Sequence, residues 1–236
     1  MRKYSKLKFN SMIMKKIIIQ LCLFIVSASI IGCSENRKSD SKVSKEISNQ
    51  DSIEKAKKKE RALKAKKKRE KKEKLDSLKV ALKPLFKEKY DDFTGSTWVH
   101  LKSEPPYRNQ NAMYAYFMLD SSKKATNFRF VYQYYADDWL FIDQMTFNID
   151  GENINISPDF KHDNSDGMIW EWCDASVGRD YYNDIPLSFI KKLIKGKKVK
   201  VRLYGSTYRD DRAVTQNQIK MIKNVYNYYV ALGGTF

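Results

Sequence analysis

The chain has 236 residues and a formal net charge of +17 at pH 7. Residues 1–33 carry six Lys or Arg and no acids, residues 34–92 carry 21 bases against 12 acids, and residues 93–236 carry 18 against 16. Nearly all of the positive charge therefore lies before Phe93, whereas the aromatic part of the chain is close to neutral. This distribution disfavours a basic globular nucleic-acid-binding protein, and we expect no specific nucleic-acid partner.

The first predicted element is an apolar run over residues 17–31 that directly follows Lys15 and Lys16. A basic region followed by a short apolar run is typical of a secretory signal peptide. A transmembrane helix needs about 20 apolar residues, so the run favours export over permanent spanning of a membrane. Translation from Met14 would give a leader of ordinary length.

The sequence Ile30-Ile31-Gly32-Cys33 ends the apolar run and resembles the lipobox of bacterial lipoproteins. The resemblance implies that residues 1–32 are a signal peptide, cut before Cys33 by signal peptidase II, and that Cys33 carries the lipid. Two or three acyl chains give stable anchoring, whereas one is marginal. We therefore expect a protein held on a membrane of the bacterial cell envelope, the outer membrane if the source has two. The alternative is a chance Gly-Cys pair at the end of a buried helix.

A polar segment and then a charged segment follow the cysteine. Residues 33–50 begin with the cysteine that the resemblance implies is lipidated, and the residues after it offer little to bury, which predicts a flexible spacer. Residues 51–92 are rich in Lys, Glu, Ala and Leu, which favour a helical tether, helical to about residue 86. The apolar residues do not sustain a heptad through residues 64–74, so a solvated single helix is favoured over a coiled coil.

Spacing the following domain from the membrane is the plainest role of this tether. A continuous helix there would reach about 50 Å at about 1.5 Å per residue. The alternative is that the lysine-rich residues 64–74 bind an anionic partner such as lipid headgroups or a surface polymer.

Residues 93–236 have the length of one globular domain. Enrichment in aromatic and β-branched residues, with alternation, predicts strands over residues 96–102, 112–119, 127–135, 139–149, 152–157, 168–173 and 198–204. Asp150-Gly151 lies between two of them and has the residue types that a type I′ hairpin turn requires.

Two helices are predicted among these strands. Residues 186–195 begin with Pro186 and are followed by Gly196, and residues 216–232 begin after a capping box of Thr215 with Gln218. Consecutive strands favour an antiparallel sheet or sandwich over a doubly wound parallel fold. We therefore predict a mainly β domain of the α+β class, with a C-terminal helix packed on the sheet and the charged tether before it.

The residues that could carry chemistry form no recognisable motif. His100 and His162 have no second His or Cys at metal-ligand spacing, and residues 159–166 read as a polar surface loop. Cys173 in an apolar strand is typically inert. The common nucleotide, hydrolase and zinc-protease motifs do not occur in the sequence. We expect no catalytic residues, no cofactor and no metal, and hence a protein that is not an enzyme.

A binding surface is the remaining candidate for function. Trp170 and Trp172 lie two residues apart, so they share one strand face, and Glu171 points to the other. Residues 208–212 between the last strand and the last helix read as a salt-bridged turn. The candidate binding residues are Trp170, Trp172, Tyr208, Arg209, Asp210 and Arg212.

Three segments of the domain, residues 134–151, 167–174 and 199–212, are similar to a domain of uncharacterised bacterial lipoproteins and prophage-encoded proteins. The similarity covers most of residues 93–236 and implies no function. Our leading hypothesis is a monomeric, lipid-anchored, non-enzymatic envelope protein that binds a protein or a glycan. The alternatives are an envelope hydrolase with a pair of carboxylates, drawn from residues such as Asp143, Glu171 and Asp174, and a phage-exclusion lipoprotein encoded by a prophage.

Overall fold

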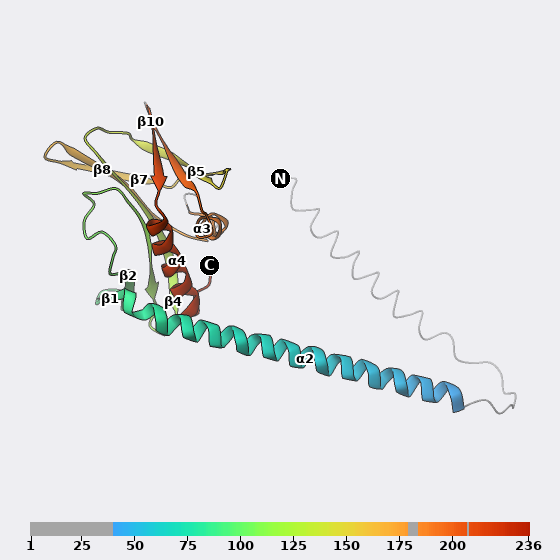
Figure 1. The fold of residues 1–236 in the computed structure, drawn as a ribbon. Coiled ribbons are helices and arrows are strands. Elements are labelled where there is room, and N and C mark those ends of the chain that lie inside the picture. The colour runs from blue at the N-terminus through green and yellow to red at the C-terminus, as the bar shows by residue number, and fades with distance from the viewer. Residues whose placement is uncertain (1–39, 179–183, 207) are drawn as a thin grey trace, which may run out of the picture. The chain divides into compact units, whose positions relative to one another are not determined.

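The computed structural model describes residues 40–178, 184–206 and 208–236. Two antiparallel sheets and a C-terminal helix make up most of the chain after residue 85, as Figure 1 shows. The predicted mainly β domain with a C-terminal helix, preceded by a charged helix, is therefore confirmed.

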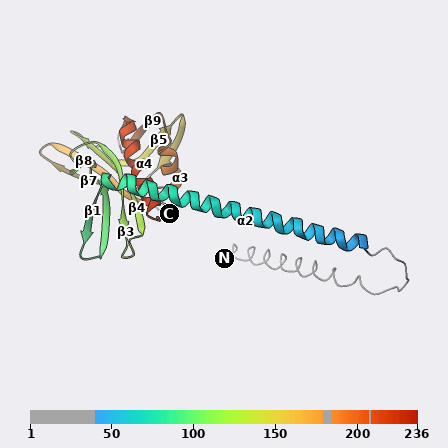
Figure 2. The same ribbon diagram turned by 60° about the horizontal axis from the view of Figure 1, so that its bottom comes forward.

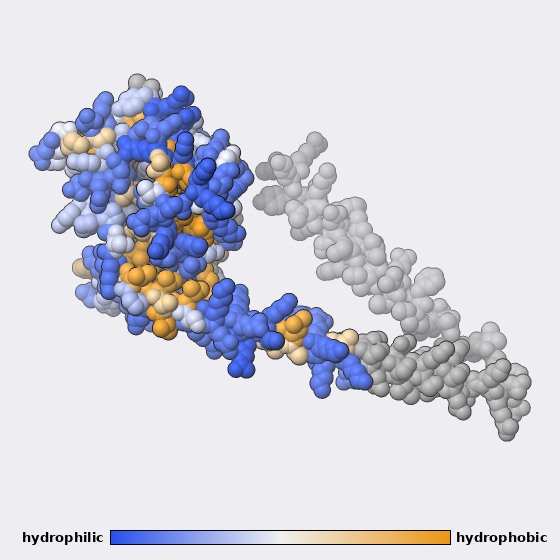
Figure 3. Space-filling model, viewed as in Figure 1, coloured by the Kyte–Doolittle hydropathy of each residue, from blue (hydrophilic) through white to orange (hydrophobic). Residues whose placement is uncertain are grey.

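The charged helix, α2, spans Asp40–Leu82 and is followed by a 3-10 turn, η1, at Lys83–Leu85. It begins within the stretch predicted as a flexible spacer and ends four residues before the predicted end, because Pro84 has no N–H to continue the helix. From Glu54 onward its side chains are almost all exposed, and Figure 3 shows a mainly hydrophilic surface there. Among the helices in the described part of the chain, none combines the length and apolar character needed to span a membrane.

The larger sheet has six strands in the order β1-β2-β3-β4-β8-β7. Their bounds are Phe86–Asp91, Ser96–Leu101, Ala112–Leu119, Ala125–Ala136, Met168–Ser176 and Phe160–Ser165 in that order. Strand β1 lies in the segment that was assigned to the tether, because Phe86 is buried opposite Leu101 and its backbone completes the edge of the sheet. The sheet thus begins before the boundary expected at Phe93.

The smaller sheet has four strands in the order β10-β9-β5-β6, with bounds Arg209–Val214, Val199–Gly205, Ile142–Ile149 and Glu152–Ile156. The hairpin between β5 and β6 turns at Asp150 and Gly151, which have φ of 51° and 95°. Two consecutive positive φ angles define the predicted type I′ turn, which is confirmed.

Three sequence-based predictions about strands were wrong. The sequence predicts a loop over residues 159–166 and a turn over residues 208–212, but most of the first segment belongs to β7 and most of the second to β10. Both are edge strands whose side chains are largely exposed, so they tolerate the polar residues that hid a strand pattern in the sequence. The strand predicted from residue 139 begins at Ile142, because the N–H groups of Leu140 and Phe141 bond to a side chain instead of a strand.

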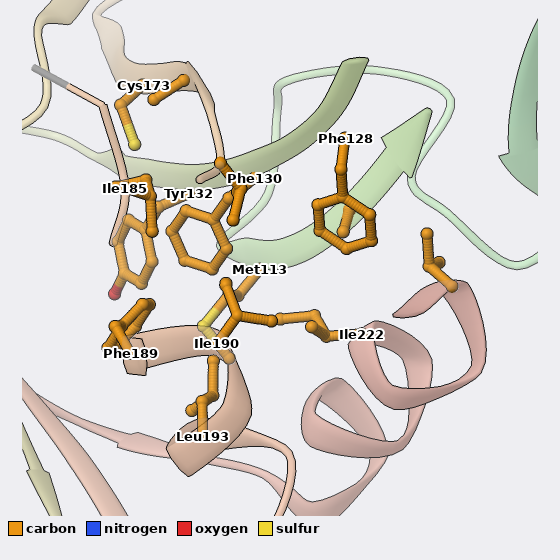
Figure 4. Packing of buried hydrophobic residues seen from close by; sticks show 14 of the residues in the cluster. Met113, Phe128, Phe130, Tyr132, Cys173, Ile185, Phe189, Ile190, Leu193 and Ile222 are labelled. Carbon is orange, nitrogen blue, oxygen red and sulfur yellow. The ribbon is translucent and has the colours of Figure 1, made fainter. Parts of the chain in front are cut away.

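Both helices of the domain pack against one face of the six-stranded sheet. Helix α4, Gln216–Ala231, has the predicted capping box and contacts β3 and β4, and Figure 2 shows it beside β4. Helix α3, Leu187–Leu193, places Phe189 between the sheets, with its ring 5.7 Å from Phe130 of β4 and 4.8 Å from Phe147 of β5. Figure 4 shows Phe189, Ile190 and Leu193 directed into this core.

Alternation divides the side chains of the six-stranded sheet between two faces. The core face carries the buried residues of β3 and β4 such as Phe117 and Phe130, against which α3 and α4 pack. The opposite face, which we call the outer face, carries their half-exposed neighbours such as Tyr116 and Arg129. In Figure 3, hydrophobic surface gathers in the lower part of the domain, around the positions of α4 and β4 in Figure 1.

Candidate functional site

Trp170 and Trp172 lie on the outer face of the six-stranded sheet. The burial pattern of β8 alternates throughout, so both indoles are half-exposed while Glu171 between them is buried on the core face. This division of the three side chains is the one predicted from sequence. Trp172 is opposite Gln133 of the neighbouring strand β4.

A loop crosses part of this face. Residues 102–111 connect β2 to β3, and the guanidinium of Arg108 lies 4.2 Å from the centre of the Trp172 ring. The Asn111 side chain donates to the Tyr135 carbonyl and accepts from the Tyr135 N–H, which fixes the end of the loop on β4. Because the Arg108 guanidinium covers its ring, Trp172 is less accessible to a ligand than its position in the sequence suggests.

A hollow of about 540 Å³ lies on the same face beside this loop. We call it the Trp98 hollow; it is lined by residues 89–93 together with Trp98, His100 and Tyr116. The His100 ring stacks on Tyr116 at 4.7 Å, and the Trp98 ring meets Tyr116 edge-on at 5.5 Å. The volume is within the range of about 300–1,000 Å³ that is usual for small-ligand sites.

A polar network behind the rings fixes their positions. The Tyr116 hydroxyl donates to Asp174 at 2.6 Å, and the same carboxylate accepts from Arg129 Nε at 2.7 Å. Arg129 also donates to the Ser176 hydroxyl at 3.2 Å. Burial, followed by the hydrogen bond to Asp174, raises the pKa of Tyr116 above its ordinary value, so the ring remains neutral. The neighbouring Tyr114 has a pKa raised to about 12, mainly by burial.

The His100 ring of the Trp98 hollow is held in place by a residue of the loop between β2 and β3. His100 Nδ1 lies 2.9 and 3.1 Å from the two carboxylate oxygens of Glu104, whose side chain is only 9% exposed. Lys87 Nζ is 3.5 Å from the same carboxylate. Because a carboxylate accepts, Nδ1 is the donor, and Nε2 of a neutral ring is then an acceptor for a ligand.

The other predicted binding residues lie on the opposite side of the six-stranded sheet. Arg212 of β10 pairs with Asp210 at 2.7 Å, and its guanidinium lies 4.5 Å from the centre of the Tyr134 ring on the core face. Tyr208 precedes this strand, and Arg209 begins it. The predicted salt bridge is present, but the structure does not bring these residues together with Trp170 and Trp172.

The residues considered for catalysis are held in structural roles. Cys173 is fully buried, which raises the pKa of its thiol to about 12 and keeps it protonated near neutral pH. Glu171 and Asp174 lie on opposite faces of β8, so they do not face a common substrate. In the described ranges there is no group of three or more His, Cys, Asp or Glu side chains able to hold a metal ion.

Sequence reasoning missed the residues at the centre of this site. Trp98, His100 and Tyr116 were assigned to strands without a functional role, since each matches ordinary strand alternation. Among the described residues, α3 and α4 pack on the core face and leave the outer face without a second apolar layer, and the residues of β2 and β3 do not reveal this placement. A signal was present in the alternation itself, because Trp98 and His100 share one face of β2 opposite the buried Val99.

No known protein family, curated protein or solved structure matches this chain. The similarities to the lipobox and to the domain of prophage-encoded lipoproteins therefore remain expectations from the sequence. The proposed lipid acceptor, Cys33, and the signal peptide lie outside the described residues.

Proposed function

We propose that the protein is a lipid-anchored protein of the bacterial cell envelope whose β domain binds a glycan in the Trp98 hollow. The observation that carries the glycan assignment is a floor of half-exposed rings, fixed by a polar network behind them. Trp98, His100 and Tyr116 supply the rings, and Asp174 and Arg129 hold Tyr116 in place.

The chemistry of a sugar matches this floor. One face of a pyranose ring presents C–H groups, which pack on the face or edge of an aromatic ring. Its hydroxyls need donors and acceptors at the edge of the site, where the carboxylates of Asp91 and Asp92 and the ring nitrogen of His100 lie. The Asp91 oxygen already accepts from the N–H groups of Phe93 and Thr94, so Asp92 is the freer acceptor.

The rings of the Trp98 hollow are held in place before any ligand binds, which supports a binding role for them. A ring that is held before the ligand arrives loses little conformational entropy on binding, which improves affinity without added contact area. The network reaches from β3 through β4 to β8, since Tyr116, Arg129 and Asp174 belong to three neighbouring strands. Its half-buried ion pair stabilises one arrangement of the floor.

The lipid anchor rests on the resemblance of Ile30-Ile31-Gly32-Cys33 to the lipobox. An anchored protein with a long charged helix before its domain would present the Trp98 hollow to glycans of the envelope. The exposed side chains of α2 beyond Glu54 agree with a solvated spacer.

Calorimetric titration of the full chain with chitotriose, cellotriose and maltotriose tests the glycan assignment. We expect at least one trisaccharide to bind, and Trp98→Ala and His100→Gln to weaken that binding by tenfold or more. The matched control is Tyr107→Ala, which removes an exposed ring outside the hollow and is expected to leave affinity unchanged. Thermal melting of each variant reports whether it is folded. Failure of all three sugars to bind, or wild-type affinity in folded Trp98→Ala protein, would contradict the proposal.

A further inference from the structure

Two aromatic rings stack on the surface just before β5, away from the residues of the Trp98 hollow. Trp139 and Phe141 have ring centres 5.3 Å apart and an interplanar angle of 11°. The His162 ring of β7 meets them edge-on at 5.7 and 5.9 Å, and the Tyr208 hydroxyl donates to the Trp139 carbonyl. Phe141 is 47% exposed and Tyr208 44%. We call Trp139, Phe141, His162 and Tyr208 the aromatic platform.

A buried carboxylate holds the backbone of the platform. Glu171 is 1% exposed, and its oxygens accept from the N–H groups of Leu140, Phe141 and Ile142 at 2.8, 2.9 and 2.7 Å. Burying a carboxylate is unfavourable unless hydrogen bonds compensate it. All three bonds are made to the short segment that carries the two stacked rings, which makes this segment rigid.

The segment is also held in an unfavourable backbone conformation. Phe141 has a φ of 53°, in the left-handed region that a bulky residue rarely adopts. Such strain persists only where the surrounding structure enforces it, and it concentrates at functional sites. Here the bonds from Glu171 enforce the conformation, and its result is an exposed ring stacked on Trp139.

The segment that carries the two stacked rings is acidic, whereas Lys161 and Arg209 adjoin His162 and Tyr208 in the chain. Residues 136–144 include Asp137, Asp138 and Asp143, all exposed, and no Lys or Arg. Partial desolvation raises the pKa of Tyr208, and the nearby charge of Asp138 raises it further. The Asp138 carboxylate accepts from the Trp139 N–H at 2.8 Å, so it lies directly beside the platform.

We infer that the aromatic platform is a docking site for a basic segment of a partner protein, with a Lys or Arg cation over the Phe141 ring and Asp137 and Asp138 beside it. A cation over an aromatic face is attracted by the ring quadrupole, and carboxylates at the rim add to that attraction. A rigidly held aromatic cluster is also the usual centre of a protein interface. The carboxylates of Asp137 and Asp138 would repel an acidic partner, so they favour a basic segment.

Titration of the full chain with a hexa-arginine peptide tests this assignment, with a hexaglutamine peptide as the neutral probe. The informative variant is Phe141→Gly, because glycine adopts a positive φ freely and the change removes only the ring. We expect hexa-arginine to bind wild-type protein, Phe141→Gly to bind at least tenfold more weakly, and its melting temperature to stay the same or rise. Replacing Asp137 and Asp138 together by Asn is expected to weaken binding and reduce its salt dependence.

Tyr107→Gly is the matched control, since it removes a more exposed ring outside the platform and is expected to leave peptide affinity unchanged. Phe141→Asn, whose side chain also tolerates a positive φ, replaces the glycine variant if that one does not fold. Equal hexa-arginine affinity of the wild-type and ring-less proteins would overturn the assignment. So would binding of hexaglutamine as tightly as hexa-arginine.

Discussion

Gly205 at the end of β9 lies directly against the carbonyl of Leu140, so that a Cβ built on this glycine would be 1.8 Å from the Leu140 oxygen. The contact is with backbone, which cannot rotate away as a side chain does. It places the start of β5 tightly on β9, where Ile142 pairs with Gly205. The segment with the stacked rings is thus fixed both by this contact and by Glu171.

Gly205→Ala should therefore be strongly destabilising. We expect a loss of more than about 3 kcal/mol in the free energy of unfolding, or no folded protein, because the backbone of two strands must separate. Gly95→Ala is the control: Gly95 has a φ of 64° but no atom within 4 Å of the added Cβ, so strain alone should destabilise by about 1 kcal/mol. Urea unfolding measures both, and equal losses would show that the Leu140 contact is unimportant.

Glu171→Gln should destabilise the domain by about 2 to 4 kcal/mol, because the amide loses the charge and presents a donor to backbone N–H groups. The exposed Glu88 in β1 supplies the control, since Glu88→Gln should change stability by less than about 0.5 kcal/mol. Chemical denaturation of both variants measures the difference. A near-neutral Glu171→Gln would mean that the three bonds contribute little to stability.

Alkaline pH should destabilise the domain through Cys173. Its folded pKa of about 12 lies above the ordinary value of 9.0, because burial disfavours the thiolate. The corresponding stabilisation is therefore complete below pH 9 and is lost as the pH rises towards 12. Once the unfolded thiol is ionised, the free energy of unfolding should fall by about 1.4 kcal/mol per pH unit for this proton.

Urea unfolding between pH 8 and pH 10 measures this slope. Cys173→Ala should reduce the decline between pH 8 and pH 9, where the unfolded thiol begins to ionise while tyrosines with an ordinary pKa of 10.0 have hardly begun to do so. Comparison of slopes separates the proton effect from the packing change, which lowers stability equally at each pH. Identical slopes for the two proteins would contradict the role given to the thiol.

Cys33→Ser should abolish lipidation, since the thiol is the acyl acceptor that the lipobox resemblance implies. We expect loss of label from a fatty-acid probe and a shift of the protein out of the membrane fraction. Cys22→Ser is the matched control, because this cysteine lies in the apolar leader and should leave labelling unchanged. Persistent labelling of the Cys33→Ser protein would exclude the anchor.

Local signals in the sequence determined the type of most elements. Alternation of apolar and polar residues predicted β2 to β6, β8 and β9, and Asp150-Gly151 and Thr215 predicted one turn and one helix start. These features depend on neighbouring residues: the φ angles that Asp and Gly tolerate, and the side-chain cap that satisfies free N–H groups at a helix start. Alternation in β8 also separated Trp170 and Trp172 from Glu171.

Tertiary structure alone decided which side chains meet and which face stays open. β7 and β10 are strands because the edges of β8 and β9 supply hydrogen-bond partners to polar segments with no strand pattern of their own. Asp174 of β8 reaches Tyr116 of β3 across the intervening strand β4, and Glu171 accepts from N–H groups 29 to 31 residues away in the chain. Such contacts depend on strand order and on the placement of α3 and α4 over one face, and neither is encoded in the periodicity of a single segment.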